Sequence, residues 1–301
     1  MEETQKPTKK GLRKLATFHN ENYKKLLIIP LILLVFSFVY LGIFYTQHGD
    51  IIQKDISLKG GTSITINGEV DAEALTQALS EKLEDLGTRE IYDLVTREKI
   101  AIIIETTAGI EEAQTILEDY LGYELTEENS SVEFTGSSLS DNFYKQLLIA
   151  ILIAFFFMAI VVFIIFRTPI PSIAVIISAF ADILMTLVTV NLLGMKVSSA
   201  GIIALLMLIG YSVDTDILLT TRMLKRDEGS LNERLFGAFK TGTTMTLTSL
   251  FAVLFALIVV KSFSPVLSQI FTILSIGLAF DLFNTWITNA SILKWYMEKK
   301  K

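Results

Sequence analysis

Four aspartates lie inside long apolar stretches of the sequence: Asp182, Asp214, Asp216 and Asp281. A carboxylate at the centre of a membrane-spanning helix costs roughly 2.5–3.5 kcal/mol on insertion scales, so such acids mark candidate functional sites. The same stretches contain no Lys or Arg. We therefore expect the acids to hold protons, to face a bundle interior or water, or to pair with a group on another chain.

The spacing of two of these acids separates their roles. Asp214 and Asp216 are two positions apart, a rotation of about 200° on a helix, so they point in opposite directions. Asp216 shares a helix face with two polar side chains, Ser212 and Thr220. Asp216 is therefore the favoured member of the pair.

A shared site for proton binding follows from these positions. Asp182 and one of the Asp214/Asp216 pair are expected to touch, because they lie on consecutive helices joined by a short turn. Two carboxyl groups in a low-dielectric site cannot easily both ionise, so one is expected to hold a proton. Asp281 would extend this site across the bundle. The alternative for one member of the pair is a local contact with Arg222 or Lys225.

Hydroxyl side chains are dense in the segment KTGTTMTLTS, residues 240–249. Next to buried acids, Thr244 and Thr248 would support a file of water molecules. The simpler alternative is that these threonines bond to their own helix backbone.

Conventional enzyme chemistry finds no support in the sequence. There is no cysteine, which excludes disulfides, thiol catalysis and cysteine-ligated metals. The LKGGT segment, residues 58–62, lacks the spacing and the following helix of a phosphate-binding loop. No Ser-His-Asp set, metal cluster or nucleotide fingerprint is present, so we expect no catalytic residue, metal, cofactor or nucleic-acid partner.

The elements that must position the aspartates are membrane-spanning helices. The chain has 51% hydrophobic residues and a mean hydropathy of +0.52, too apolar for an ordinary soluble domain. The first apolar stretch is interpreted as a permanent anchor. Six stretches have the roughly 20-residue length that crosses a bilayer, at residues 26–45, 147–166, 172–192, 200–219, 241–260 and 270–290.

The distribution of charge predicts the orientation of these spans. Residues 46–146 contain 21 acidic and 7 basic residues, a net charge of −14, whereas the rest of the chain has 11 acidic and 19 basic residues. Basic residues gather in the N-terminal segment 1–25, after the fourth span and in the tail 294–301. By the positive-inside rule, both termini are cytoplasmic and residues 46–146 lie outside the cytoplasmic membrane.

The acidic segment 46–146 has the pattern of a small folded domain. Its apolar residues alternate as in strands at residues 55–66 and 131–140, with two further strands within 91–106. Helical periods run through residues 71–87 and 109–123, each closed by a glycine. The order β-α-β-β-α-β predicts an α+β domain of the ferredoxin-like type between the first and second spans.

Three motifs together resemble the SecD–SecF family of protein-export membrane proteins, and specifically the archaeal SecF branch. ISLKGGT, residues 56–62, is similar to the strand that begins the family's first outer domain. SAFADILMTL, residues 178–187, resembles its third-span motif, with Asp182 as the central acid. IGYSVDTDILLTTR, residues 209–222, resembles its fourth-span motif, which ends at Arg222 here. Asp214 and Thr215 stand where the family has Asn-Asp, Asp216 follows one place later, and Thr221 stands where the family has an acid before the Arg.

The resemblance implies a function and a set of partners. The family belongs to the resistance-nodulation-division superfamily, in which SecD and SecF supply two six-span halves of one unit in the lipid bilayer. The resemblance implies that the protein is an accessory of the Sec translocon channel. It also implies that a flow of protons or cations moves the outer domains, which handle the preprotein. The alternatives are a non-transducing assembly subunit and, less favoured, a small-molecule exporter of the same superfamily.

Overall fold

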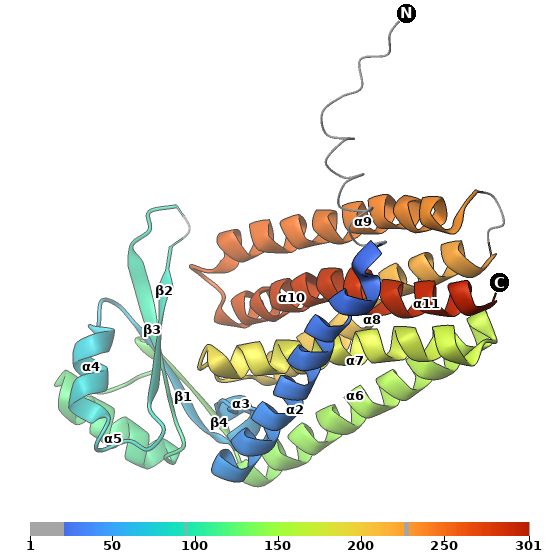
Figure 1. Cartoon of the computed structure of the whole chain (residues 1–301). Coiled ribbons are helices and arrows are strands. Elements are labelled where there is room, and N and C mark those ends of the chain that lie inside the picture. Colours follow the sequence, from blue (N-terminus) through green and yellow to red (C-terminus); the bar gives the residue numbers. More distant parts are fainter. Residues whose placement is uncertain (1–20, 94, 226–228, 301) are drawn as a thin grey trace, which may run out of the picture.

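The computed structural model describes residues 21–93, 95–225 and 229–300. Most of the predicted basic N-terminal segment, residues 1–20, and Lys301 of the tail lie outside the described residues. A bundle of long helices carries a small α/β domain at one end (Figure 1). We call this the domain end of the bundle. The first described residues and the last helix meet at the opposite, terminal end, where the Tyr23 hydroxyl donates to Glu298 at 2.5 Å.

Six helical stretches in the described part of the chain are long and apolar enough to cross a membrane. All six predicted spans lie within these stretches. The last of the six is continuous but changes its helical type twice. The elements are α2 (Ile28–His48), α6 (Ser137–Phe166), α7 (Pro169–Leu192), α8 (Ser199–Lys225), α9 (Leu231–Val260), and the succession of α10 (Pro265–Asn284), the π-helical turn η1 (Thr285–Asn289) and α11 (Ala290–Lys300).

Burial divides these helices into a centre and a periphery. Most of α7 and α8 is buried within the chain, whereas α2, α6 and α9 expose large apolar side chains along most of their length. Phe251, Phe255 and Ile258 on α9 are examples. Apolar faces of this kind are stable against lipid tails or against further helices.

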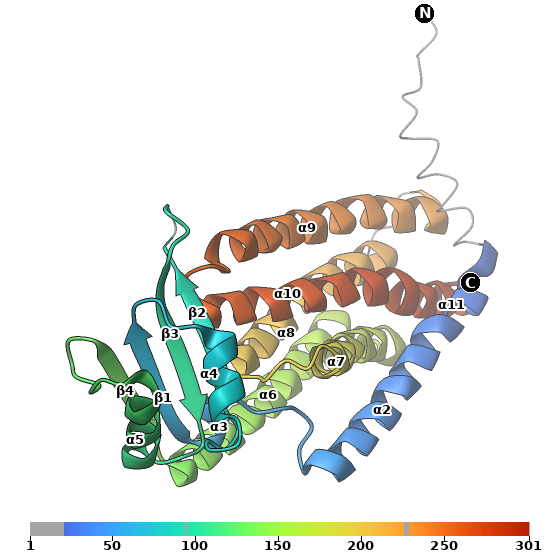
Figure 2. The ribbon, with the colours of Figure 1, turned by 90° about the vertical axis from the view of Figure 1, so that its left-hand side faces the viewer.

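The α/β domain is built from the helical turn α3 (Ile56–Lys59), β1 (Gly61–Asn67), α4 (Ala72–Leu79), β2 (Gly87–Tyr92), β3 (Lys99–Thr106), α5 (Ile110–Leu121) and β4 (Ser130–Thr135). The strands form one antiparallel sheet in the order β2-β3-β1-β4 (Figure 2). Ile64 and Ile104 on one sheet face pack with Leu75 of α4 and Leu117 of α5. The predicted order of strands and helices is therefore the observed one.

Three predicted strands have different limits in the structure, and one of them is β2, which begins at Gly87, before the predicted range 91–106. Residues 55–66 were expected to form one strand, but Asp55 caps the helical turn α3, accepting from the Ser57 amide at 2.9 Å. The chain then bends at Gly60 and Gly61, both with positive φ, and β1 begins. A side chain at Gly60 would clash with the backbone of Ser137, so the turn requires glycine. The strand expected at 131–140 ends at Thr135, and α6 starts two residues later.

The α/β domain is fastened to the domain end of the bundle by backbone and side-chain contacts. The Asp55 amide donates to the Val197 carbonyl at 3.1 Å, and the Val197 amide to the Gln53 carbonyl at 2.6 Å. The Tyr92 amide donates to the Ser262 carbonyl at 3.0 Å. A hollow of about 340 Å³ remains between the polar face of the sheet and the first turns of α8 and α10.

Charged pairs add to this junction. Lys196, in the loop between α7 and α8, lies 2.8 Å from Asp85 of the α/β domain, which also pairs with Lys59 at 2.6 Å. Partial burial alone would raise the pKa of Asp85, but hydrogen bonds from both lysines outweigh it and lower that pKa. Arg89 pairs with Glu105 at 2.7 Å. There burial is the larger effect, and the pKa of Glu105 lies above its ordinary value despite Arg89.

Candidate functional site: a cluster of three buried aspartates

Three of the four predicted aspartates meet in the middle of the bundle. Asp182 on α7, Asp216 on α8 and Asp281 on α10 are each fully buried, with 0% of their surface exposed. We call these three residues the acid cluster. Hydrogen bonds connect each of them to a neighbouring helix, so the cluster is a junction of the central helices and not three separate acids.

Asp182 accepts hydrogen bonds from two other helices. The Ser212 hydroxyl of α8 donates to one carboxyl oxygen at 2.6 Å. The Asn284 amide, at the end of α10, donates to the other oxygen at 2.7 Å. Both carboxyl oxygens are therefore satisfied by neutral donors.

Only one of the two carboxyl oxygens of Asp216 accepts hydrogen bonds, and all of its donors are neutral. Its Oδ1 accepts from the Thr285 hydroxyl at 2.9 Å and from the Asn289 amide at 2.8 Å, and lies 3.4 Å from the Ser178 hydroxyl. Its Oδ2 is buried and has no hydrogen-bond partner. This oxygen is positioned to bind a proton or a water molecule.

Asp281 is joined to Asp216 through a shared hydroxyl. The Thr285 oxygen lies 3.2 Å from Asp281 Oδ1 as well as 2.9 Å from Asp216 Oδ1. The Thr246 hydroxyl of α9 lies 3.4 Å from Asp281 Oδ2. A single hydroxyl proton can serve only one carboxylate at a time, which couples the two acids.

Within residues 21–93, 95–225 and 229–300, no ion pair involves the acid cluster. Three carboxylates without a cation in a low-dielectric interior repel one another and lose their hydration, so the site favours bound protons. Among these same residues no group of three or more acidic or histidine side chains is arranged to hold a metal ion. The chemistry that the geometry supports is proton binding and release.

The π-helical turn η1 aims three donors at the cluster. Asn284 precedes the turn, Thr285 opens it and Asn289 closes it. The first contacts Asp182, and the other two contact Asp216. Single π-helical turns are rare and often occur at functional sites.

Two glycines let the surrounding helices approach the cluster closely. A methyl group at Gly242 of α9 would clash with the Trp286 ring of η1. A methyl group at Gly277 of α10 would clash with the Leu208 side chain of α8. The first close approach brings Thr246 to Asp281.

The remaining predicted residues have other positions. Asp214 is exposed on the surface of α8 and is not part of the acid cluster. Arg222 donates to the Gly237 carbonyl at 2.5 Å and does not pair with either acid. Thr244 and Thr248 are exposed and donate to carbonyls of their own helix, so they do not support the cluster. Of the predicted helix-face pair, Ser212 binds Asp182, and Thr220 is buried one turn beyond Asp216.

Sequence reasoning missed five residues of the site: Ser178, Thr246, Asn284, Thr285 and Asn289. The last three share one signal, a density of amides and hydroxyls in the segment NTWITN of an otherwise apolar span. Polar side chains in a membrane-spanning helix usually face other helices. Thr246 differs from Thr244 and Thr248 only in helix face, which composition cannot show.

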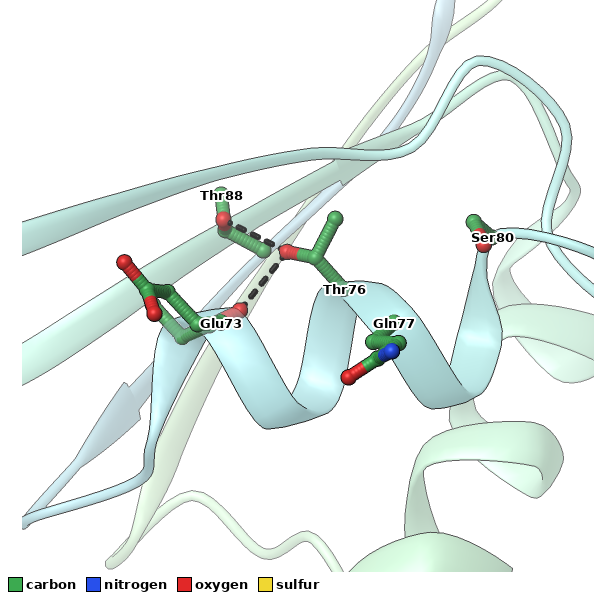
Figure 3. A pocket seen from close by; sticks show the side chains of 6 residues that line it. Glu73, Thr76, Gln77, Ser80 and Thr88 are labelled. Carbon is green, nitrogen blue, oxygen red and sulfur yellow. Dashed lines mark hydrogen bonds between the residues drawn. The ribbon is translucent and has the colours of Figure 1, made fainter.

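A separate pocket lies on the α/β domain, between α4 and β2, and none of the residues that line it belongs to the acid cluster (Figure 3). Thr76 and Thr88 point toward each other there, with their hydroxyl oxygens 2.9 Å apart. Glu73 is the only charged residue among those that line it. The pocket offers no cluster of reactive groups.

Comparison with known proteins finds similar membrane proteins. Residues 116–299 match the family model described as protein export membrane protein SecD/SecF, C-terminal. The chain is 42% identical to the protein-export membrane protein SecF of Methanocaldococcus jannaschii, over 92% of this chain and 96% of that protein. It is 40% identical to the SecF of Methanothermobacter thermautotrophicus, over 92% and 94%.

The fold resembles that of a solved bacterial protein. The crystal structure of SecDF from Thermus thermophilus, a translocon-associated membrane protein, superposes with a TM-score of 0.71 at 18% sequence identity. The match covers 92% of this chain and 38% of the SecDF chain. The chain therefore spans well under half the length of that protein.

Proposed function

Because the chain belongs to the SecD/SecF family of protein-export membrane proteins, we propose that it is the SecF-type subunit of a SecDF complex that assists Sec-dependent translocation. In this proposal, proton or cation flow through the acid cluster drives movement of the α/β domain. The observation that carries the proposal is the burial of three carboxyl groups with neutral hydrogen-bond donors and no cation partner among the described residues.

Gain or loss of a proton would change the charge of the cluster and hence the packing preference of its helices. The helices that carry the acids also hold the α/β domain. At the domain end, the Ser199 amide of α8 donates to the Ser57 hydroxyl at 3.0 Å. Gln269 of α10 donates to the Lys196 carbonyl at 2.6 Å. A shift of α8 against α10 would therefore reach the domain directly.

The proposed topology places the protein in the cytoplasmic membrane with both termini inside and residues 46–146 outside. The charge distribution supports it, through the positive-inside rule. The contact between Tyr23 and Glu298 also supports it, because it joins the start of the first span to the last helix at the end away from the α/β domain. The antiparallel order β2-β3-β1-β4 supports a ferredoxin-like fold for that domain.

The proposed partners are SecD, the Sec translocon channel, the translocating preprotein and surrounding lipid. Asp214 supports a partner within the membrane, because an exposed acid on a spanning helix is costly unless another chain covers it. The share of the SecDF chain that this chain leaves unmatched would correspond to the SecD half in this arrangement.

The test uses membrane vesicles that contain the chain, SecD and the Sec channel. Asp182→Asn and Asp216→Asn keep the side-chain shape but cannot titrate, so the gradient-dependent part of preprotein translocation is expected to fall while the complex still assembles. Asp141→Asn, an exposed aspartate at the start of α6, is the control and should have no effect. Undiminished gradient-dependent assistance in both cluster variants would refute the coupling role.

The same preparation separates the two alternatives. A non-transducing assembly subunit would assist translocation equally well after a protonophore dissipates the gradient. The junction contacts that fasten the α/β domain to the bundle are the observation that favours this alternative. A small-molecule exporter would instead show substrate-dependent transport in reconstituted vesicles.

A further inference from the structure

Several buried polar atoms between the acid cluster and the terminal end of the bundle have no hydrogen-bond partner. They are Asp216 Oδ2, Thr220 Oγ1, Asn289 Oδ1 and Ser172 Oγ, on residues that are at most 1% exposed. Buried polar atoms in native proteins are almost always satisfied by protein or by ordered water. Four such atoms in one region therefore point to bound water.

The positions of these residues form a series that leads away from the cluster. Thr220 lies one helical turn beyond Asp216, roughly 6 Å along α8 in the direction of its end at Lys225. Ser172 is in the first turn of α7, which begins at the same end of the bundle. Asn289 closes η1 and donates to Asp216. Each residue is thus on the terminal side of the cluster or in contact with it.

On the opposite side of the cluster, the facing parts of α8 and α10 are apolar, and the unpartnered Asn191 Oδ1 and Ser140 Oγ lie on α7 and α6 close to the domain end. Between the acids and the hollow at the domain end, α8 and α10 present buried aliphatic side chains that pack in one core. These are Ile202, Leu205 and Leu208 on α8 and Ile273, Leu274 and Leu278 on α10. On α7, the Thr186 hydroxyl donates to the Asp182 backbone carbonyl at 2.6 Å, so it is not among the buried polar atoms without a partner.

Leu208 and Gly277 make this apolar layer tight. Gly277 lies one turn before Asp281 on α10, and the absence of a side chain there leaves room for Leu208 to fill the space between the helices. Leu208 itself is completely buried. A small separation of α8 from α10 would open the layer at this point, because close packing cannot stretch without leaving a void.

We propose that, in this conformation, water bound along Asp216, Thr220, Asn289 and Ser172 connects the acid cluster to the terminal end of the bundle, while Leu208 packed on Gly277 closes it from the domain end. The proposal rests on the proposed function and adds a direction to it. With the termini in the cytoplasm, the structure represents the state in which the cluster exchanges protons with the cytoplasm. Opening of the Leu208 contact is then the step that admits protons from outside.

The first experiment measures access to single thiols, which the cysteine-free chain allows without removing any native residue. Thr220→Cys and Leu205→Cys are placed in the complete complex and treated with Ag⁺ in inverted and in right-side-out vesicles. After unfolding, the remaining thiols are counted with a maleimide label. Ag⁺ should block Thr220→Cys only in inverted vesicles, where the cytoplasmic face is outward, and should leave Leu205→Cys free in both.

The second experiment measures proton leak through the apolar layer. Leu208→Ala leaves a cavity on the domain side of the cluster, so vesicles holding this variant should lose an imposed pH gradient several-fold faster than the unmodified complex. Leu219→Ala is the matched control, since it removes an equally buried leucine from the same helix on the terminal side. Its leak should remain at the unmodified level because the Leu208 layer is intact.

These outcomes separate the access path from the coupling role. Thr220→Cys that stays unreactive from both faces, or reacts only in right-side-out vesicles, would overturn the path, whatever the Asn variants of the cluster do. An equal leak from Leu208→Ala and Leu219→Ala would overturn the role of Leu208. If the path is found but Asp216→Asn keeps full gradient-dependent assistance, the coupling function fails and the hydrated path stands.

Discussion

Asn284 and Asn289 give the buried aspartates hydrogen bonds without giving them a countercharge. An arginine in the same place would hold the carboxylate ionised and prevent it from taking up a proton. A neutral amide stabilises the charged form less, which leaves both protonation states accessible. The proposed reversible proton exchange therefore depends on the absence of a cation as much as on the presence of the acids.

This reasoning gives a prediction for Asn284. Asn284→Ala removes the donor that lies 2.7 Å from Asp182, and a lost buried hydrogen bond costs about 1–3 kcal/mol. We expect a lower thermal stability and loss of gradient-dependent translocation, with an altered dependence of the residual activity on pH. The measurements are thermal unfolding in detergent and translocation in vesicles over a range of pH.

Asn191 provides the control for that prediction. It is equally buried, but it donates to the Ile51 carbonyl at the domain end, away from the acids. Asn191→Ala should lower stability by a similar amount and leave gradient dependence unchanged. If both variants lost gradient dependence equally, Asn284 would be a structural residue only.

The residues of the site were predictable where an acid stood in an apolar span. Asp182, Asp216 and Asp281 follow from that rule, and the helix face shared with Ser212 separated Asp216 from Asp214. Thr246 was not predictable because alternate threonines in residues 240–249 cover several faces of α9. Which face meets Asp281 is decided by the packing of Gly242 on Trp286, a tertiary contact.

At the scale of the element, the membrane helices were predictable because each needs a long apolar run, but their ends were not. Helix α9 starts at Leu231, ten residues before the predicted span, because Ser230 and Glu233 form a capping box ahead of it. The π-helical turn η1 had no signal in hydrophobic periodicity. It is stabilised by the hydrogen bonds that Thr285 and Asn289 make to Asp216.

Shortening η1 tests whether its extra residue matters. Deletion of Ile287 should restore an ordinary α-helical turn, because a π-helical turn holds one residue more than an α-helical turn. Asn289 would then lie three and not four residues after Thr285, which displaces its amide from Asp216, whereas Asn284, which precedes the deletion, would still reach Asp182. We expect an assembled complex with no gradient-dependent translocation. Full activity of the deletion variant would show that the π-helical geometry is dispensable.

The junction between the α7–α8 loop and the α/β domain is expected to depend on pH. The pKa of Asp85 is lowered in the folded state, because hydrogen bonds from Lys196 and Lys59 outweigh burial. A lowered pKa stabilises the fold above the unfolded value of about 3.9 and loses that contribution as the pH falls through the folded value. The Lys196–Asp85 pair should therefore be intact at neutral pH.

Lys196→Ala tests this dependence. Because the pair is partly exposed, its removal should cost about 1 kcal/mol or less at neutral pH. The difference in thermal stability from the unmodified chain should shrink as the pH falls below about 4. Lys261→Ala, an exposed lysine just after α9, should show no such difference. If Lys196→Ala lowered the thermal stability equally at neutral pH and below about pH 4, Lys196 would not act through Asp85.

The pKa of Glu105 is shifted in the opposite direction to that of Asp85. Burial raises its pKa above the ordinary glutamate value, so it takes up a proton at a higher pH than Asp85 does. Acidification should therefore weaken the Arg89–Glu105 pair inside the hollow before it weakens the Lys196–Asp85 pair that fastens the domain.

At the scale of the whole molecule, the described chain has the features of one half of an assembly. Helices α2, α6 and α9 expose apolar faces, and α8 exposes an acid between Met207, Tyr211 and further apolar residues. Lipid can cover the apolar faces but not the acid. Gly210 leaves open space beside Asp214, because a side chain built there meets no atom within 4 Å. A second helix can therefore approach α8 closely at this level.

Asp214 should thus hold the partner rather than carry protons. Asp214→Leu removes an exposed membrane acid that costs roughly 2.5–3.5 kcal/mol, so the isolated chain should become more monodisperse in detergent. The same change removes the group that a donor or cation on SecD would bind, so co-purification of SecD should fall. Asp141→Leu, at an exposed position on α6, should change neither measurement. Unchanged recovery of SecD with Asp214→Leu would place the partner on another face and leave the exposure of this acid without a structural reason.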